Sequence, residues 1–272
     1  MKLDVCAYIC VYNEEYRIRY TLESFQWCRQ IIIVDKNSKD RTREIAKSYG
    51  VELYQMENSS SYDVNEFQFL KHCKCEWLMF VTASDIIDPK LVSQIKDIVS
   101  CKSGQFDSIS IPYHRYVLGI YNKYSPWYSE NSLSVFKNNI VSINAEGVHD
   151  AISITPKNTC KIGFEGDNAL SHLTHETVDV MMERHLRYVR AEGENYNKES
   201  LRPAFKVVLG GMRKCLMCIW GGWDGIALMF AFLSYCMLSF IYKWEKKKCS
   251  ASQKYFEMRE TNLRDWEKFQ NL

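Results

Sequence analysis

The sequence lacks several features that would assign the chain to a simple class of protein. Its 272 residues carry a formal net charge of only +2, without the excess of basic residues that marks a general nucleic-acid binder. Its 11 cysteines follow no regular framework, and the first residues lack the long apolar run of a secretory signal. We therefore expect no nucleic-acid partner and a reducing, cytoplasmic setting.

The chain does contain short aliphatic runs that each end at polar residues. Runs rich in β-branched residues are typical of strands buried on both faces, as in parallel sheets. Apolar residues at helical spacing between them predict covering helices. The predicted strands are residues 3–11, 31–34, 51–54, 76–81, 109–116 and 133–136, and the predicted helices are 15–27, about 42–50, 64–73 and one that starts at Pro89. This order predicts an α/β fold with a mostly parallel sheet.

Asp35 follows the second predicted strand directly, and further polar residues come after it. In open parallel sheets, the loops at the carboxyl ends of the strands leave a crevice that binds ligands. We therefore expect Asp35 to enter a pocket and Asp40 to cap the next helix. The alternative role for Asp35 is local, as a cap for a turn with Asn37 and Ser38.

An aromatic-rich loop is predicted at residues 119–127, in the middle of the chain. Aromatic residues make up 14% of the sequence, a share that serves either a core or a ligand site. Trp127 and Tyr128 are candidates for a platform on which a sugar stacks. The alternative is a partly buried structural loop.

The last quarter of the chain changes in character. Residues 225–242 carry no charge, and lysines follow at 243 and 246–248. A run of 18 residues lies near the lower limit for spanning a bilayer. A spanning helix, a helix in the membrane interface and a buried core helix all fit this run. We expect interfacial or shallow membrane contact.

Three motifs carry a resemblance to a known family. They are VYNE at residues 11–14, IVDKNSKDRT at 33–42 and WLMFVTASDIIDP at 77–89. In order and spacing they resemble the motifs of family 2 glycosyltransferases with a GT-A fold. GVHD at 147–150, LSH at 170–172 and GWDG at 222–225 are similar to the subgroup that contains bacterial lipopolysaccharide-core glucosyltransferases.

The resemblance implies a Rossmann-like GT-A domain over residues 1–170, followed by a helical region over 171–272. The nucleotide-sugar half would cover about 1–100 and the acceptor half about 101–170. The implied activity is that of a hexosyltransferase-type enzyme, which transfers a sugar from a nucleotide donor to a hydroxyl with inversion at the anomeric carbon.

The resemblance also assigns the donor contacts. The family's acid after the second strand, here Asp35, hydrogen-bonds the nucleobase. A UDP-sugar is the favoured donor, because a carboxylate accepts a hydrogen bond from the imide N–H of uracil. Tyr12, Glu14, Asn37 and Ser84 fall within the same donor-binding motifs.

The resemblance implies a divalent cation but also departs from the family here. The family's metal-binding acids usually flank one residue, with a third acid behind them. Thr82 and Ser84 replace the flanking pair, and only Asp85 matches the trailing acid. Mg²⁺ or Mn²⁺ would join the donor diphosphate to the protein through oxygen ligands. Asp85 and His172 are the implied metal contacts, with a loop acid and a packed histidine as the alternatives.

An inverting transferase needs a carboxylate that accepts the proton of the acceptor hydroxyl. Asp150 stands where the subgroup carries a histidine followed by an acid, usually Glu, so the resemblance assigns the base to Asp150. The alternative is a surface acid, with His149 packed beside it. Glu146 is the next candidate for the base.

Together with the apolar run, the resemblance implies a peripheral enzyme at the cytoplasmic face of the cell membrane. It would extend a cell-surface polysaccharide or lipopolysaccharide on a glycan or lipid-linked acceptor. The alternative is a catalytically weak GT-A module that binds a nucleotide sugar or glycan and recruits a partner at the membrane. A sugar nucleotidyltransferase fits less well, because no glycine-rich basic loop follows the first strand.

Overall fold

The computed structural model describes residues 2–57, 64–143, 152–197, 200–248 and 251–270. The chain divides into two compact units. Unit 1 comprises Met1–Lys123 and Trp127–Val178, and unit 2 comprises Tyr124–Pro126 and Asp179–Leu272.

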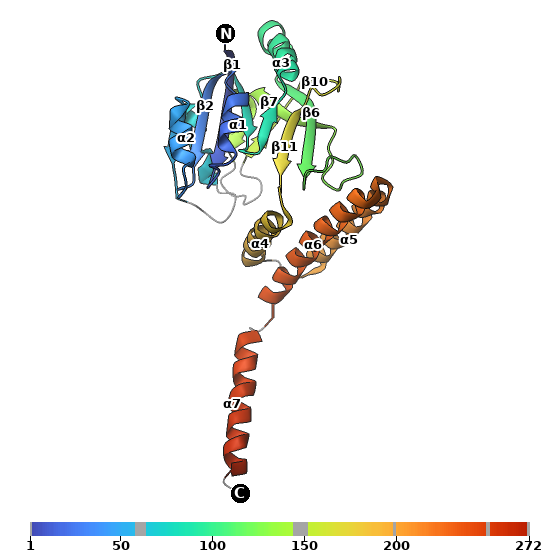
Figure 1. Cartoon of the computed structure of the whole chain (residues 1–272). Coiled ribbons are helices and arrows are strands. Elements are labelled where there is room, and N and C mark those ends of the chain that lie inside the picture. Colours follow the sequence, from blue (N-terminus) through green and yellow to red (C-terminus); the bar gives the residue numbers. More distant parts are fainter. Residues whose placement is uncertain (1, 58–63, 144–151, 198–199, 249–250, 271–272) are drawn as a thin grey trace. The chain divides into compact units, whose positions relative to one another are not determined.

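Unit 1 is built on one large sheet with the strand order β3-β2-β1-β4-β7-β6-β11-β5, and β10 pairs with β6 outside this path. The first four strands run parallel, whereas β7 is antiparallel to both of its neighbours. The strands are β1 (Leu3–Val11), β2 (Cys28–Asp35), β3 (Glu52–Gln55), β4 (Trp77–Val81), β5 (Asp85–Ile87), β6 (Ser108–Val117), β7 (Asn131–Lys137), β10 (Thr159–Lys161) and β11 (Leu170–Thr174). The predicted α/β fold with a mostly parallel sheet is confirmed (Figure 1).

β1 is buried almost throughout because both faces of the sheet are covered. Val5, Ala7 and Ile9 belong to one core cluster, whereas Cys6 and Tyr8 belong to a second cluster on the opposite face. This division follows from the two-residue period of a strand.

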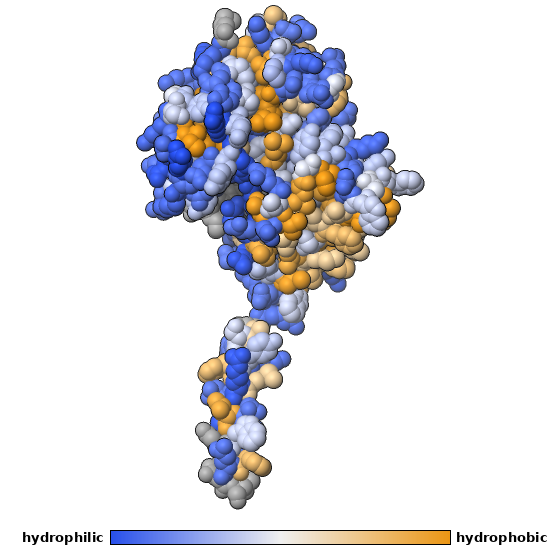
Figure 2. All heavy atoms as spheres, viewed as in Figure 1, coloured by the Kyte–Doolittle hydropathy of each residue, from blue (hydrophilic) through white to orange (hydrophobic). Residues whose placement is uncertain are grey.

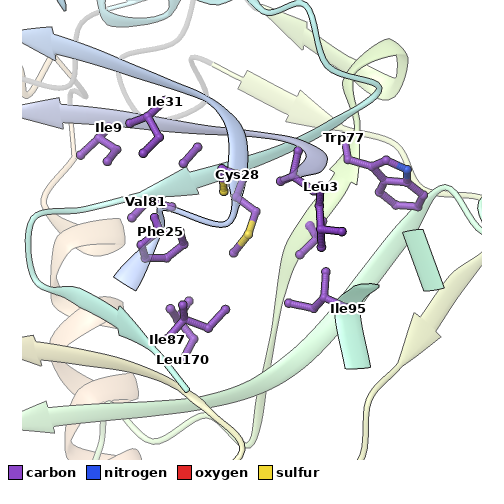
Figure 3. Close-up of a cluster of buried hydrophobic side chains, with 14 of the residues drawn as sticks. Leu3, Ile9, Phe25, Cys28, Ile31, Trp77, Val81, Ile87, Ile95 and Leu170 are labelled. Atoms are coloured by element: carbon purple, nitrogen blue, oxygen red, sulfur yellow. The ribbon is translucent and has the colours of Figure 1, made fainter. Parts of the chain in front are cut away.

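Helices cover the first of these clusters. α1 (Ile18–Ser24) and α3 (Pro89–Cys101) contribute Leu22 and Ile95 to it, and Figure 3 shows Ile95 beside side chains from several strands. η1 (Val64–His72) and a small sheet of β8 (Val141–Ile143) with β9 (Ile152–Ile154) pack against the second cluster. α2 (Thr42–Ser48) connects β2 with β3.

Several elements differ from the predictions. Residues 64–72 form a 3-10 helix rather than an α-helix, and the Tyr8 hydroxyl donates to the carbonyl of Glu66, which a regular α-helix would pair internally. α1 is shorter than the predicted helix over 15–27. β5 and β11 were not predicted as strands, because each is short and gains its partners only through long-range pairing. The sheet therefore continues past the domain limit expected at residue 170, and unit 1 extends to Val178.

Unit 2 is helical over the residues that the structure describes. Its elements are α4 (Val178–Glu194), α5 (Arg202–Cys215), η3 (Leu216–Gly221), α6 (Gly222–Lys246) and α7 (Ala251–Gln270). α5, η3 and α6 form a helical hairpin, and the predicted uncharged run lies within α6. By length and composition alone, the stretch Arg202–Lys246 suffices to cross a membrane, and 28% of its most apolar window is buried.

The turn of the hairpin depends on a close approach at one glycine. A Cβ on Gly225 would lie 2.0 Å from the carbonyl oxygen of Cys218, whereas a Cβ on Gly210 in α5 would meet nothing within 4 Å. Gly225→Ala should therefore destabilise the chain by about 1–3 kcal/mol through overpacking. Gly210→Ala should stabilise it by roughly 0.8–1 kcal/mol through helix propensity. Urea unfolding followed by circular dichroism compares the two variants, and equal midpoints would contradict the close approach.

Candidate functional site

The carboxyl ends of β1 and β2 meet at one edge of unit 1, where Val11 pairs with Asp35. Asp35 is fully buried. Its Oδ1 accepts the N–H of Ser38 at 3.0 Å and lies 3.7 Å from Nε of Arg43. Its Oδ2 is also buried and has no hydrogen-bond partner among the described residues. The expected turn cap thus uses one oxygen, and the other is an unsatisfied acceptor whose burial is costly.

The loops after β1 and β2 are joined by hydrogen bonds between their residues. The N–H of Asn13 donates to Ser38 Oγ at 2.9 Å, and the N–H of Glu14 donates to Thr42 Oγ1 at 2.7 Å. Asn13 and Asn37 have φ angles of 53° and 62°, which asparagine adopts more readily than most residues. Two of the family-like motifs therefore fix each other's backbone.

Asp40 also joins the two loops. It was expected to be the N-cap of α2, but it lies one residue before the N-cap. The N-cap of α2 is Arg41 rather than Asp40, but Asp40 Oδ1 accepts the N–H and hydroxyl of Thr42 at 3.0 and 2.5 Å. Its Oδ2 accepts the N–H of Glu15 at 3.1 Å. Burial raises the pKa of Asp40, but these hydrogen bonds outweigh it and hold the pKa below its ordinary value. The carboxylate therefore remains charged and binds both loops.

The remaining predicted donor contacts after β1 and β2 lie at the same edge. Tyr12 follows the end of β1 directly and is half-buried. Asn37 is exposed, and its Oδ1 accepts from Lys39 Nζ at 3.3 Å. Both side chains therefore lie within the loops that follow the two parallel strands.

Arg17 links the loop after β1 with the loop after β4, and sequence reasoning missed it. Arg17 forms an ion pair with Glu14, and its Nη1 donates to Ser84 Oγ at 2.8 Å. The guanidinium thereby brings together two predicted donor contacts from separate motifs. The three-residue spacing of Glu14 and Arg17 was the available signal, because such pairs meet on a helical turn.

Asp85 and His172 lie together although 87 residues separate them in the sequence. The antiparallel pairing of β5 with β11 places them opposite each other. Asp85 Oδ1 is 2.7 Å from His172 Nδ1, and its Oδ2 accepts the N–H and hydroxyl of Thr82 at 2.7 and 3.0 Å. The structure thus brings together both residues predicted to bind metal, and one of the residues that replace the usual acids holds the carboxylate.

Two residues of β6 surround this pair. The Tyr113 ring stacks on His172 with 6.1 Å between centroids, and the Arg115 guanidinium lies 5.4 Å from the Tyr113 ring centre. Arg115 Nε is buried and has no hydrogen-bond partner in the described part of the chain. The period of β6 puts Tyr113 and Arg115 on one face, and the pairing of Arg115 with His172 brings that face to the site.

The side chains described here give a divalent cation few ligands. No group of three or more His, Cys, Asp or Glu suitable for a metal occurs in the described ranges. Both oxygens of Asp85 face protein groups, and Nδ1 of His172 faces Asp85. Of the atoms of this pair, Nε2 of His172 is therefore left as a ligand for a cation. A carboxylate often holds the second nitrogen of a metal-bound imidazole in this way. The residues fit a cation only if the donor phosphates supply most of its ligands.

The predicted sugar platform lies on an aromatic cluster. The Tyr128 ring is 6.0 Å from Tyr121, which in turn lies 4.2 Å from the ring of His114. Burial lowers the pKa of His114, so its imidazole is neutral at pH 7. Tyr128 is 38% exposed and so keeps surface available for stacking.

A cavity of about 1000 Å³ adjoins the contact between Arg17 and Ser84, and both residues line it. Most of its wall is apolar and comes from α1, β5 and the start of α3, with Trp27, Ile87 and Val92 among the residues. Its size and apolar wall are those of a small-molecule site.

The predicted base Asp150 lies outside the described residues, together with Glu146 and His149. β8 and β9 stand on either side of this segment in the sequence and pair with each other. Val141 and Ile152 pack against the second core cluster. The described residues that flank the segment are therefore fixed on that face of the sheet.

Among the solved structures with a similar chain trace are two from Staphylococcus aureus and one from Pyrobaculum calidifontis. Staphylococcus aureus TarS is 12% identical with a TM-score of 0.49, and the match covers 90% of this chain and 55% of that one. TarS 1-349 in complex with UDP-GlcNAc is 13% identical with a TM-score of 0.47, over 90% of this chain and 91% of that one. The mannosyltransferase PcManGT from Pyrobaculum calidifontis, in complex with GDP-Man and Mn²⁺, is 12% identical with a TM-score of 0.49, over 91% and 89%.

The family comparison rests on sequence. The model of the family described as Glycosyl transferase family 2 matches residues 6–144. That range is just over half of the 272 residues and contains β1, β2 and β4 with the loops that follow them. The chain therefore belongs to glycosyl transferase family 2 and is a nucleotide-sugar glycosyltransferase with a GT-A-like fold.

Proposed function

We propose that the chain transfers a hexose from a UDP-sugar, with inversion, to the hydroxyl of a glycan or lipid-linked acceptor. The observation that carries the donor choice is the buried, unpartnered Oδ2 of Asp35. The imide N–H of uracil is a donor that matches this oxygen, and the resulting charge-assisted bond favours uridine over bases without that N–H. Because Asp35 has no exposed surface, binding of the nucleobase requires a local rearrangement that exposes Oδ2.

The diphosphate would lie beside the Glu14, Arg17 and Ser84 contact. Ser84 Oγ accepts from Arg17, so its own hydroxyl hydrogen remains to donate to a phosphate oxygen. Arg17 lies at the same point, with its charge paired to Glu14. These two groups orient the donor without a covalent step.

A divalent cation, if bound, would be held by His172 Nε2, with Asp85 orienting the ring through Nδ1. When bound, it would neutralise charge on the leaving diphosphate. The relatives TarS and PcManGT were solved with UDP-GlcNAc and with GDP-Man and Mn²⁺, which supports a nucleotide donor and a metal-assisted variant of this chemistry.

Asp150 is our candidate for the base. In an inverting transfer, the hydroxyl oxygen of the acceptor attacks the anomeric carbon from the face opposite the diphosphate. A carboxylate accepts the proton of that hydroxyl during the attack. The flanking strands β8 and β9 pair with each other and pack against the second core cluster.

We infer that the acceptor belongs to the synthesis of cell-surface polysaccharide or lipopolysaccharide. The enzyme would work as a peripheral protein at the cytoplasmic face of the cell membrane. The apolar helix α6 supports this proposal, since an apolar helix of this kind can hold a soluble domain near a lipid-linked acceptor.

One observation favours a second function, a catalytically weak module that binds nucleotide sugar or glycan and recruits a partner. Asp85, the one acid that matches the family's metal-binding region, is engaged by Thr82 and His172. Release of UDP from a panel of UDP-sugars separates the two functions: turnover supports the transferase, and binding without turnover supports the module.

Asp35→Asn tests the nucleobase contact. The change keeps the size of the side chain but removes its charge and one acceptor oxygen, so UDP affinity should fall by about tenfold or more. Isothermal titration calorimetry measures this, with Glu44→Gln on the exposed face of α2 as the control. UDP affinity equal to that of the unaltered chain would remove Asp35 from the site.

His172→Ala tests the cation contact independently of activity. Without UDP, neither the unaltered chain nor the variant should bind Mn²⁺, because the described residues offer too few ligands. With UDP, the unaltered chain should bind Mn²⁺ at least about tenfold more tightly than the variant. Electron paramagnetic resonance of free Mn²⁺ measures binding with and without UDP, and His72→Ala is the control. Tight Mn²⁺ binding by the variant in the presence of UDP would show that His172 does not bind the cation.

Asp150→Asn tests the base. Turnover should drop by at least about a hundredfold with UDP affinity unchanged, because a base acts mainly in the transition state. Asp97→Asn on the exposed side of α3 is the control. Near-normal turnover in the Asp150 variant would move the role to another carboxylate, with Glu146 examined next.

A further inference from the structure

α5 carries an unusual charge for a helix of this chain. It contains four basic residues and no acidic residue, within a protein whose net charge is only +2. All four are exposed, and none forms an ion pair with another described residue: Arg202, Lys206, Arg213 and Lys214. The positive charge of α5 is therefore available to a partner outside the chain.

The apolar residues of α5 continue beyond the part that packs within unit 2. Ala204, Gly211 and Cys215 are buried, and a Cβ on Gly211 would lie 2.9 Å from Cys236 Sγ of α6. Phe205, Leu209 and Met212 lie beside this buried stripe at helical spacing and are 48–51% exposed. α5 thus has a wide apolar sector bordered by cations, a pattern typical of helices that lie in a membrane interface.

The turn of the hairpin exposes large apolar side chains. Five large apolar residues in and beside η3 are 55–85% exposed: Leu216, Met217, Ile219, Trp220 and Trp223. Tryptophan favours the boundary between lipid and water, because its ring is apolar and its N–H needs a polar partner. In Figure 2, apolar residues gather over the hairpin of α5 and α6.

The other end of α6 is held by protein. Glu192 of α4 accepts from Tyr235, Ser239 at 2.6 Å and Lys243 at 2.6 Å, all on the carboxyl-terminal half of α6. Burial raises the pKa of Glu192, but the hydrogen bonds from Lys243, Ser239 and Tyr235 outweigh it, so the net pKa is lowered and the carboxylate stays charged. A spanning α6 would carry this charged network and α4 into the hydrocarbon, which is costly.

We infer that the hairpin inserts its turn into the interface of an anionic membrane without spanning it. In this arrangement, η3 and Trp223 enter the headgroup region, and the cations of α5 contact lipid phosphates. The inference rests on the proposed membrane association and deepens it. It names the residues, the depth and the lipid charge, and it moves the main contact from the expected run 225–242 to α5 and the turn.

Charge decides between a membrane and a second copy of the chain as the occupant of this face. An isologous dimer through α5 would place four cations opposite four cations. An anionic bilayer instead offers phosphates to those cations and an apolar layer to the turn.

Vesicle partitioning tests the inference with the full chain. Phosphatidylcholine vesicles with and without phosphatidylglycerol are compared at low and high salt. The unaltered chain should bind only the anionic vesicles at low salt. The double variant Lys206→Glu with Arg213→Glu should bind them at least about tenfold more weakly. Lys47→Glu with Lys96→Glu, at exposed sites in unit 1, makes the same change in net charge and should bind normally.

A second variant reports on the turn. Trp220→Ser with Trp223→Ser should lose vesicle binding while circular dichroism and UDP affinity stay unchanged, since neither residue lies in unit 1. Equal binding to neutral and anionic vesicles, or normal binding by the α5 variant, would overturn the inference. If the unaltered chain is a dimer and both variants are monomers, the face binds a second copy of the chain, and this result would also overturn the inference. Failure of the unaltered chain to bind UDP would instead count against the donor proposal alone.

Discussion

The site depends on the position of β1 between two parallel neighbours. β1 pairs in register with β2 on one side and with β4 on the other, so the carboxyl ends of all three strands come to the same edge. Each of these strands gives way to polar residues there, and both faces of β1 are occupied by core side chains. A shift of one residue in β1 would exchange its two faces and destroy both clusters. The register therefore fixes where the loops of the candidate site begin.

From that edge outward, the loops are held by one another rather than by regular structure. Hydrogen bonds of Asn13 and Glu14 to the loop after β2, and of Arg17 to Ser84 after β4, join three separate segments. Asp35 Oδ2 is the one buried carboxylate oxygen without a hydrogen-bond partner among the described residues. A buried carboxylate oxygen without a partner is costly and calls for an explanation, and a hydrogen bond from a bound ligand is the explanation that we propose.

The sequence predicted the parts of the molecule that local pattern controls. The aliphatic runs gave β1, β2 and β4, and Pro89 marked the start of α3. β11 escaped prediction because its five residues form a strand only by pairing with β5 and β6. The contact of Asp85 with His172 follows from that pairing, so spacing alone offered no signal for it. The role of α5 was also missed, because its cations and apolar residues separate into faces only when they are placed on a helix.

Reading of the nucleobase by Asp35 is the central claim of this account, and a pair of nucleotides tests it directly. UDP and CDP share the sugar and diphosphate, but uracil presents an imide N–H where cytosine presents a lone pair. Calorimetric titration of the unaltered chain with each nucleotide isolates that one difference. If the Asp35 carboxylate contacts the nucleobase, UDP should bind at least about tenfold more tightly than CDP. Equal affinities for UDP and CDP would contradict the account.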